Sequence, residues 1–223
     1  MKMNLSELEI RVLACLMEKE LSTPENYPLS LNALVSACNQ KSNRDPVLGL
    51  TEADVVRGLE ALGGRGLARL TTTGGRVAKY CHSVAGKLGL AAPARAVLAE
   101  LMLRGPQTVG ELRNRAERMA ELADLAAVEA VLMELRQCGP PLVARLPRQA
   151  GRKEQRYAQL LAGMPEFTEE QEADIERPET QGGAGGQLAA GERLAKLEGE
   201  VGTLRTEIAA LRQELEELIT SFA

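Results

Sequence analysis

Aromatic side chains are scarce in this chain. They make up 2% of its 223 residues, and tryptophan is absent. Proteins that bind single-stranded nucleic acid usually stack the bases on several exposed aromatic rings. The composition argues against that class and predicts an aliphatic core, for which a hydrophobic content of 44% is sufficient.

Closely spaced cysteine pairs are also missing. The four cysteines are Cys15, Cys38, Cys81 and Cys138, and no two of them form the CxxC spacing of a structural zinc site. Cys15 and Cys38 fall within apolar helical patterns, which indicates buried free thiols. Charged residues near the N-terminus argue against a signal peptide, and no apolar run approaches the ~18 residues of a membrane span. These absences predict a cytoplasmic protein without membrane contact.

The sequence also shows no recognisable set of catalytic residues. The single histidine, His82, adjoins Cys81, but neighbouring residues of a strand point to opposite faces. The sequence contains no glycine-rich phosphate loop and no set of nucleophile, base and oxyanion donors. We therefore predict neither an enzymatic activity nor a cofactor.

Charge is distributed unevenly along the chain. Residues 1–165 carry 22 basic and 17 acidic side chains, a net charge of +5. Residues 166–223 carry 5 basic and 14 acidic side chains, a net charge of -9. A mildly basic body with an acidic tail is compatible with nucleic-acid contact limited by the tail, and equally with an ordinary soluble surface.

Capping residues and apolar spacing predict three helices in the first part of the chain. Ser6 opens a capping box before a helix over about residues 7–20, Ser30 caps a second helix, and Thr51 begins a third. A β-hairpin over residues 67–82 follows them.

The same order of elements repeats. The pattern Val-Leu-Ala-x-Leu-Met occurs at residues 12–17 and again at 97–102. Thr108 opens another capping box, Asp124 precedes another apolar helix, and residues 142–157 resemble the first hairpin. The repeat predicts an internal duplication of a three-helix-plus-hairpin module. That layout is typical of a winged helix, a helix-turn-helix variant whose third helix can enter a DNA groove.

The fold class we predict is mainly α (α+β). It comprises two tandem winged-helix modules of three helices and a β-hairpin each, a flexible acidic linker and a C-terminal coiled-coil helix. The first module is placed in residues 1–86, the second in 87–164, the glycine-rich linker in 165–191 and the coiled coil in 192–223.

The C-terminal segment has a heptad pattern of apolar residues. Its seam contains Leu194, Leu197, Val201, Leu204, Ile208, Leu211, Leu215 and Leu218, and it continues to Phe222. The residues that flank the seam would meet as opposite charges in a parallel pair of helices. The pattern favours a homodimer formed by a parallel coiled coil; the alternative is a single helix folded back on the body.

Residues 17–47 form a long polar-apolar stretch that resembles the signature of the bacterial YceH family. Residues 103–116 and 142–157 are similar to motifs in the second half of that family, so the resemblance covers about residues 5–163. It implies tandem winged helices. It implies no activity, because the family is uncharacterised.

The distribution of charge gives opposing indications about DNA binding. The third helix of each module is acidic, which would repel phosphates. Both hairpins and the helix after Thr108 are basic, and basic wings can lie along a phosphate backbone. The candidate nucleic-acid-binding residues are Arg65, Arg69, Arg76, Lys79, Arg113, Arg115, Arg148, Arg152, Lys153 and Arg156.

A polar loop at residues 39–46 has two interpretations. Lys41 and Arg44 could contact phosphate. Alternatively, Asn39, Gln40 and Asn43 could cap helices and fix the loop internally. We favour this interpretation because asparagine and aspartate commonly satisfy nearby backbone groups.

Two functional hypotheses follow. The leading one is a DNA-associated, regulator-like protein that contacts double-stranded DNA through basic wings. The alternative is an interaction scaffold whose winged helices bind another protein, without nucleic acid.

Overall fold

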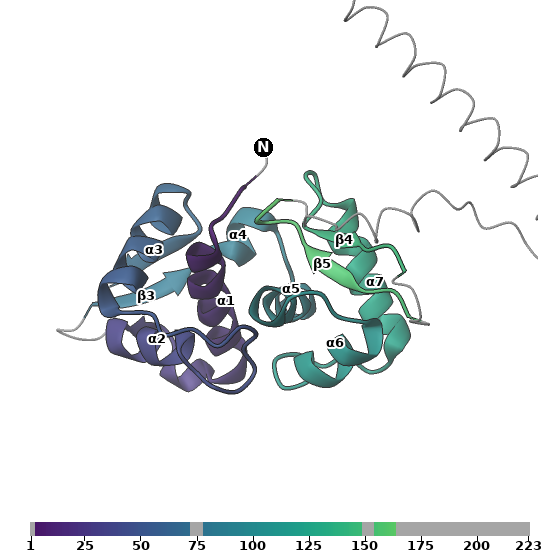
Figure 1. The fold of residues 1–223 in the computed structure, drawn as a ribbon, viewed down its shortest axis with the longest axis horizontal. Coiled ribbons are helices and arrows are strands. Elements are labelled where there is room, and N and C mark those ends of the chain that lie inside the picture. Colours follow the sequence, from purple (N-terminus) through teal and green to yellow (C-terminus); the bar gives the residue numbers. More distant parts are fainter. Residues whose placement is uncertain (1–2, 72–77, 149–153, 164–223) are drawn as a thin grey trace, which may run out of the picture. The chain divides into compact units, whose positions relative to one another are not determined.

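A computed structural model of the chain describes residues 3–71, 78–148 and 154–163. The chain divides into two compact units, Met1–Glu176 and Arg177–Ala223. All described residues belong to the first unit, which contains α-helices and short antiparallel strands (Figure 1). The predicted linker and coiled coil, including the seam from Leu194 to Leu218, lie outside the described residues.

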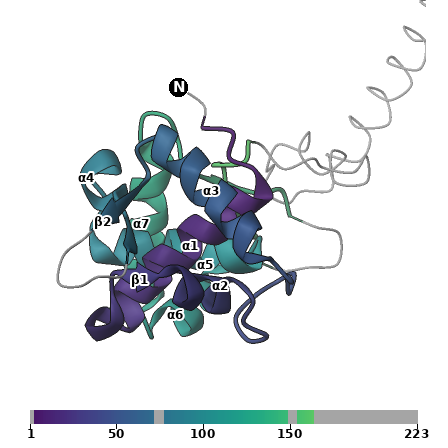
Figure 2. The ribbon, with the colours of Figure 1, turned by 90° about the vertical axis from the view of Figure 1, so that its left-hand side faces the viewer.

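The first three helices begin where their caps predict. Their bounds are α1 (Glu7–Ser22), α2 (Leu31–Cys38) and α3 (Glu52–Gly64), with a 3-10 turn η1 (Pro24–Asn26) between the first two. The side chains of Ser6, Ser30 and Thr51 each accept a hydrogen bond from a backbone N–H of the first turn. Figure 2 shows these helices with the strands beside them.

The predicted first hairpin is present. Its strands are β2 (Ala68–Thr71) and β3 (Lys79–His82), and a short strand β1 (Leu29–Ser30) extends the sheet in the order β1-β3-β2. All pairs are antiparallel, with Leu70 opposite Tyr80. A short helix that the sequence did not predict, α4 (Val84–Leu88), follows the hairpin. The predicted module boundary between residues 86 and 87 falls within this helix.

The second group of elements repeats the order of the first. It contains α5 (Ala92–Arg104), α6 (Val109–Ala116), α7 (Leu125–Gln137), β4 (Val143–Arg145) and β5 (Tyr157–Gln159). Strands β4 and β5 pair antiparallel, and Gln107 forms an isolated bridge to Tyr157. This bridge precedes α6 just as β1 precedes α2. Each helix and strand of the second group therefore has a counterpart in the first group, which contains η1 and α4 in addition.

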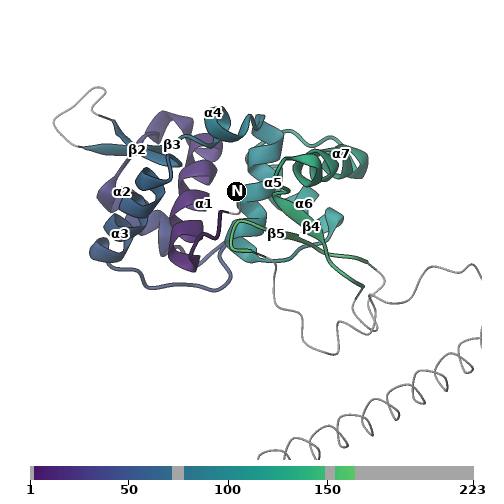
Figure 3. The ribbon, with the colours of Figure 1, turned by 90° about the horizontal axis from the view of Figure 1, so that it is seen from above.

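Helices α1 and α5, the first of each group, lie side by side at the centre (Figures 1 and 3). Residues 9–18 of α1 and 96–103 of α5 are buried without interruption. A helix that is buried on all sides must be covered by more than its own module. The two groups therefore share one hydrophobic core, which is aliphatic as predicted and includes the free thiols of Cys15 and Cys38.

Candidate nucleic-acid interface

The basic residues of the first hairpin differ in their surroundings. Arg69 on β2 is exposed and Lys79 on β3 is half-buried, and neither has a carboxylate partner among the described residues. Arg65, at the end of α3, instead donates to Glu9 Oε1 at 2.9 Å and to the carbonyl of Met3 at 2.5 Å. Arg65 therefore fastens the N-terminal segment to α3. Arg76 lies outside the described residues.

The candidate arginines on α6 and just before β5 donate hydrogen bonds to other groups of the protein. Arg156 donates to Glu111 Oε2 at 2.9 Å and to the carbonyl of Pro106 at 2.7 Å. Arg115 donates to Gln107 Oε1 at 2.6 Å, and Arg113 donates to the carbonyl of Ala123 at 3.1 Å. These hydrogen bonds link α6 to the segments that precede and follow it and to the residue before β5.

Glu111 forms ion pairs with two of these arginines, Arg115 and Arg156. Burial acts to raise its pKa, but the backbone N–H of Thr108 and the charges of Arg156 and Arg115 outweigh burial and lower the pKa. The carboxylate is therefore held ionised at the N-terminus of α6, where the helix dipole favours negative charge.

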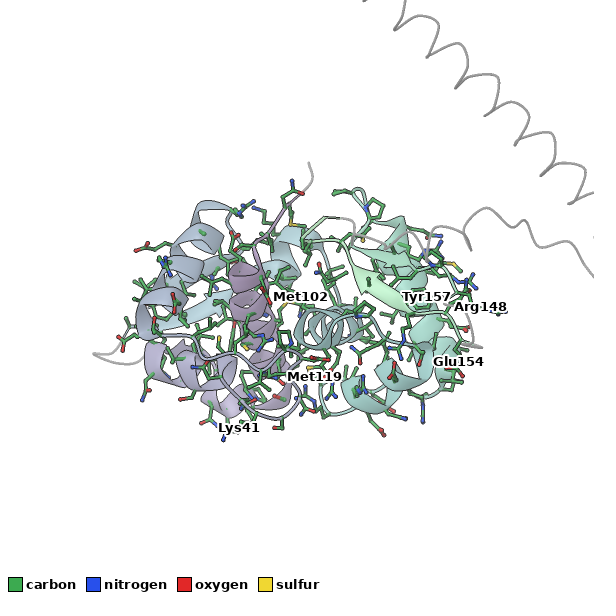
Figure 4. The ribbon with its side chains drawn as sticks, viewed as in Figure 1. Lys41, Met102, Met119, Arg148, Glu154 and Tyr157 are labelled. Atoms are coloured by element: carbon green, nitrogen blue, oxygen red, sulfur yellow. The ribbon has the colours of Figure 1, made fainter. Side chains whose placement is uncertain are left out.

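Two arginines of the second hairpin are free of carboxylate partners in the described residues and could contact phosphate. Arg145, at the end of β4, and Arg148, just beyond it, are exposed and have no carboxylate partner in the described part of the chain. Figure 4 shows Arg148 at the periphery of the molecule. Arg152 and Lys153 lie outside the described residues.

The exposed faces of α3 and α7 do not resemble phosphate-binding surfaces. On α3, Asp54 pairs with Arg57 and accepts hydrogen bonds from Thr51, which lower the pKa of Asp54 to about 2. On α7, Leu125 and Met133 are 51% and 56% exposed. The hairpins are therefore better placed than these helices to contact a duplex backbone.

The polar loop is fixed internally. Asn39 donates to the carbonyl of Leu50 at 2.8 Å and accepts from the Leu50 N–H at 2.7 Å, which closes the loop. Arg44 is 5% exposed and donates to both oxygens of Glu18, at 3.1 and 2.5 Å. The suggestion that Arg44 contacts phosphate is wrong, because a carboxylate from α1 holds its guanidinium inside the protein. Lys41 is exposed (Figure 4).

A buried network of charges extends from this loop into the second module. Arg118, which follows α6, contacts Glu18 at 2.7 Å and Glu100 on α5 at 2.6 Å. Glu18 and Glu100 are fully buried. Burial raises the pKa of Glu100, and among the described residues its Oε2 has no hydrogen-bond partner. Burial acts to raise the pKa of Glu18 as well, but hydrogen bonds and charge from Arg44 outweigh it and lower that pKa.

The sequence did not predict this network. Glu18 is 26 residues from Arg44 and 100 from Arg118, so no local spacing indicates either contact. A partial signal was present, because Glu18 directly follows Leu16 and Met17 in the apolar pattern of the first helix. A carboxylate within such a pattern requires a cationic partner.

His82 belongs to a second polar cluster beside β3. Its Nδ1 accepts from the Val84 N–H at 3.1 Å, so the proton resides on Nε2, which donates to Glu20 Oε2 at 2.9 Å. Arg95 contacts the same Glu20 oxygen at 3.2 Å, and the Tyr27 hydroxyl accepts from the His82 N–H at 2.7 Å. These contacts give His82 a structural role between α1, β3 and α5.

This cluster predicts a pH dependence of stability. Burial lowers the pKa of His82 and Arg95 adds to that effect, against Glu20, which raises it; the net direction is downward from 6.5. Because the unfolded state then binds the proton more readily, we expect stability to be full above about pH 6.5 and to fall as the pH drops through the folded-state pKa. Thermal melts between pH 8 and 5 should show this loss in the wild type and a smaller loss in His82→Gln. Parallel curves for the two proteins would contradict the prediction.

Among the described residues, no group of three or more His, Cys, Asp or Glu side chains could hold a metal ion. In the same part of the chain, no helix is both long and apolar enough to cross a membrane.

Comparison with known proteins finds similarity to uncharacterised bacterial proteins. A family model described as "Protein of unknown function, DUF480" matches residues 5–152. A UPF0502 protein of Citrifermentans bemidjiense is 66% identical over 226 residues, covering 100% of both chains. UPF0502 proteins of Geotalea uraniireducens and Pelobacter propionicus are 67% identical over 205 residues and 55% identical over 223 residues, covering 92% and 100% of both chains.

Proposed function

We propose a function from surface chemistry for this chain, which belongs to the DUF480 family of uncharacterised bacterial proteins. The proposal is association with double-stranded DNA through backbone contacts made by two wings, in a cytoplasmic protein without catalysis or a cofactor. The predicted resemblance to an uncharacterised bacterial family is confirmed, and the YceH name stays a prediction.

The order of the elements supports a tandem winged-helix interpretation. Each group contains three helices followed by two antiparallel strands, in the same order. Each pair of strands is preceded by the third helix of its group, which is the arrangement of a helix-turn-helix with a wing.

The observation that carries the proposal is the presence of exposed guanidinium groups without carboxylate partners on both hairpins. Arg69 is exposed on the first, and Arg145 and Arg148 are exposed on the second; none has a carboxylate partner in the described residues. Exposed arginines of this kind can release condensed counterions by neutralising phosphates, which supplies non-specific affinity. Arg65, Arg113, Arg115 and Arg156 contribute less, because they already bind groups of the protein.

A pair of chains would strengthen such binding. The heptad segment of residues 192–223 favours a parallel homodimer, which would present two sets of wings to one duplex.

The alternative of a protein-interaction scaffold also has a specific observation in its favour. Leu125 and Met133 on α7 are large apolar side chains that are more than half exposed. This surface is distinct from the exposed arginines of the wings, so the two activities are compatible.

The wing proposal predicts a selective loss of DNA affinity. A variant with Arg69→Ala, Arg145→Ala and Arg148→Ala should bind a labelled random-sequence duplex at least tenfold more weakly than the wild type, measured by fluorescence anisotropy. Plots of log affinity against log salt should become shallower by roughly 0.9 for each phosphate that the variant no longer neutralises.

The matched control removes three exposed basic residues away from the wings: Lys41→Ala, Arg57→Ala and Arg136→Ala. It changes the net charge by the same amount and should retain most of the affinity. Equal weakening by both variants, or no salt-dependent binding by the wild type, would refute the proposal.

A further inference from the structure

Helices α3 and α7 occupy corresponding positions in the two groups of elements. Their buried and exposed residues can therefore be compared position by position. When they are aligned on their buried residues, Val55, Leu59 and Leu62 match Val128, Leu132 and Leu135, and all six are buried. Both helices therefore use the same face to contact the core.

Their exposed faces differ in chemistry. In this alignment Glu52 of α3 corresponds to Leu125 of α7, and Glu60 corresponds to Met133. Leu125 and Met133 are 51% and 56% exposed, so the core does not require their apolar character. The polar residues on α3 show that this position in the module tolerates charge.

Four exposed residues make one side of α7 largely apolar. Leu125 and Met133 are separated by eight residues, or just over two helical turns, and exposed Ala126 and Ala130 lie beside Met133. We call these four residues the apolar strip. Exposed Glu129, four residues from both Leu125 and Met133, lies between them and interrupts the strip.

Acidic residues lie within and beside this strip. Glu129 and Glu134 are exposed and have no ion pair among the described residues, and Asp124 caps the helix beside them. Phosphate groups would be repelled here. A two-fold contact between two copies of the strip would bring the same carboxylates together, which disfavours self-association at this face.

We propose that the exposed face of α7 binds an amphipathic basic helix of another protein. Apolar side chains of such a helix would contact Leu125 and Met133. Its lysines or arginines would pair with Glu129, which lies between those two residues, and with Glu134. The face uses no wing residue, so this proposal stands or falls separately from DNA binding.

The test uses the full chain and a defined probe, a fluorescein-labelled 18-residue amphipathic helix of leucine and lysine. The variant Leu125→Glu with Met133→Glu introduces the residues that α3 carries at the same positions. We expect its affinity for the probe to fall at least tenfold in fluorescence anisotropy. The substitutions add two negative charges, so attraction by charge alone would instead make binding tighter.

Two controls complete the experiment. A peptide of the same composition, scrambled to destroy its apolar face, should bind the wild type at least tenfold more weakly than the amphipathic probe. The thermal melt of the double variant should match that of the wild type, because both substituted positions are exposed.

Unchanged or tighter binding of the amphipathic probe by the double variant would overturn the proposal. So would sedimentation measurements in which the double variant loses a self-association that the wild type shows, since the occupant of the face would then be a second copy.

Discussion

Replacing Arg44 with methionine should lower the free energy of unfolding by about 3–5 kcal/mol, the usual cost of removing one partner from a buried ion pair. The Arg44 side chain is fully buried and contacts both carboxylate oxygens of Glu18. It also donates to the carbonyl of Ala37 from two of its nitrogens, at 3.2 and 2.9 Å. Methionine fills much of the volume but removes the donors to the Ala37 carbonyl and the closest cation to Glu18, which keeps only Arg118 and Lys19 as ion-pair partners among the described residues. Urea unfolding followed by circular dichroism measures the loss.

The matched control is Arg57→Ala, which removes an arginine from an exposed pair with Asp54. Exposed pairs contribute little to stability, so its unfolding midpoint should stay close to that of the wild type. If Arg44→Met were as stable as this control, the buried network would have no energetic role.

A double variant separates the charge from the packing. Glu18→Leu combined with Arg44→Met removes both members of the pair, so it should be more stable than Arg44→Met alone. Recovery should be partial, because Arg118 also contacts Glu18 and would retain Glu100 as its remaining acidic partner. A double variant less stable than the single one would indicate that packing, not an uncompensated carboxylate, dominates.

The second large effect is expected when the two groups of elements are separated. A chain of residues 1–90 and a chain of residues 91–164 should each lack a cooperative thermal transition, whereas residues 1–164 should retain one. The reason is the shared core: α1 and α5 are buried along most of their length and pack directly against each other. Separation would expose several leucine-sized side chains, each worth about 1.5–3 kcal/mol when buried.

That cost is comparable with the 5–15 kcal/mol of stability typical of a whole domain. Circular dichroism melts of the three chains provide the measurement, and mixing the two short chains provides the control. Recovery of a cooperative transition on mixing would support the shared core. Two short chains that each melt as sharply and at the same temperature as residues 1–164 would show that each module folds independently.

Local features of the sequence predicted the helices well. Ser6, Thr51 and Thr108 each open a capping box whose reciprocal hydrogen bonds the structure contains. Such contacts join residues three apart, so the sequence alone specifies them. The short helix α4 was missed because it has five residues and no side-chain cap.

The candidate interface was predicted less completely. The sequence identified basic hairpins, and exposed Arg69 and Arg148 agree with that description. It also treated Arg65 and Arg156 as available for a ligand, although both bind carboxylates of the protein. The apolar strip of α7 was not recognised, because Leu125 looks like any other leucine of an amphipathic helix until its exposure is known.

The sequence by itself determined the order of the elements, their caps and the aliphatic character of the core, because these depend on contacts between near neighbours and on the period of apolar residues. The tertiary structure decided which charges are free. Arg65 meets Glu9 across 56 residues and Arg118 meets Glu18 across 100, since the packing of distant helices brings a carboxylate to each guanidinium. Partners so far apart in the chain leave no periodic signal, so only the folded arrangement separates the arginines that hold the protein together from those that face solvent.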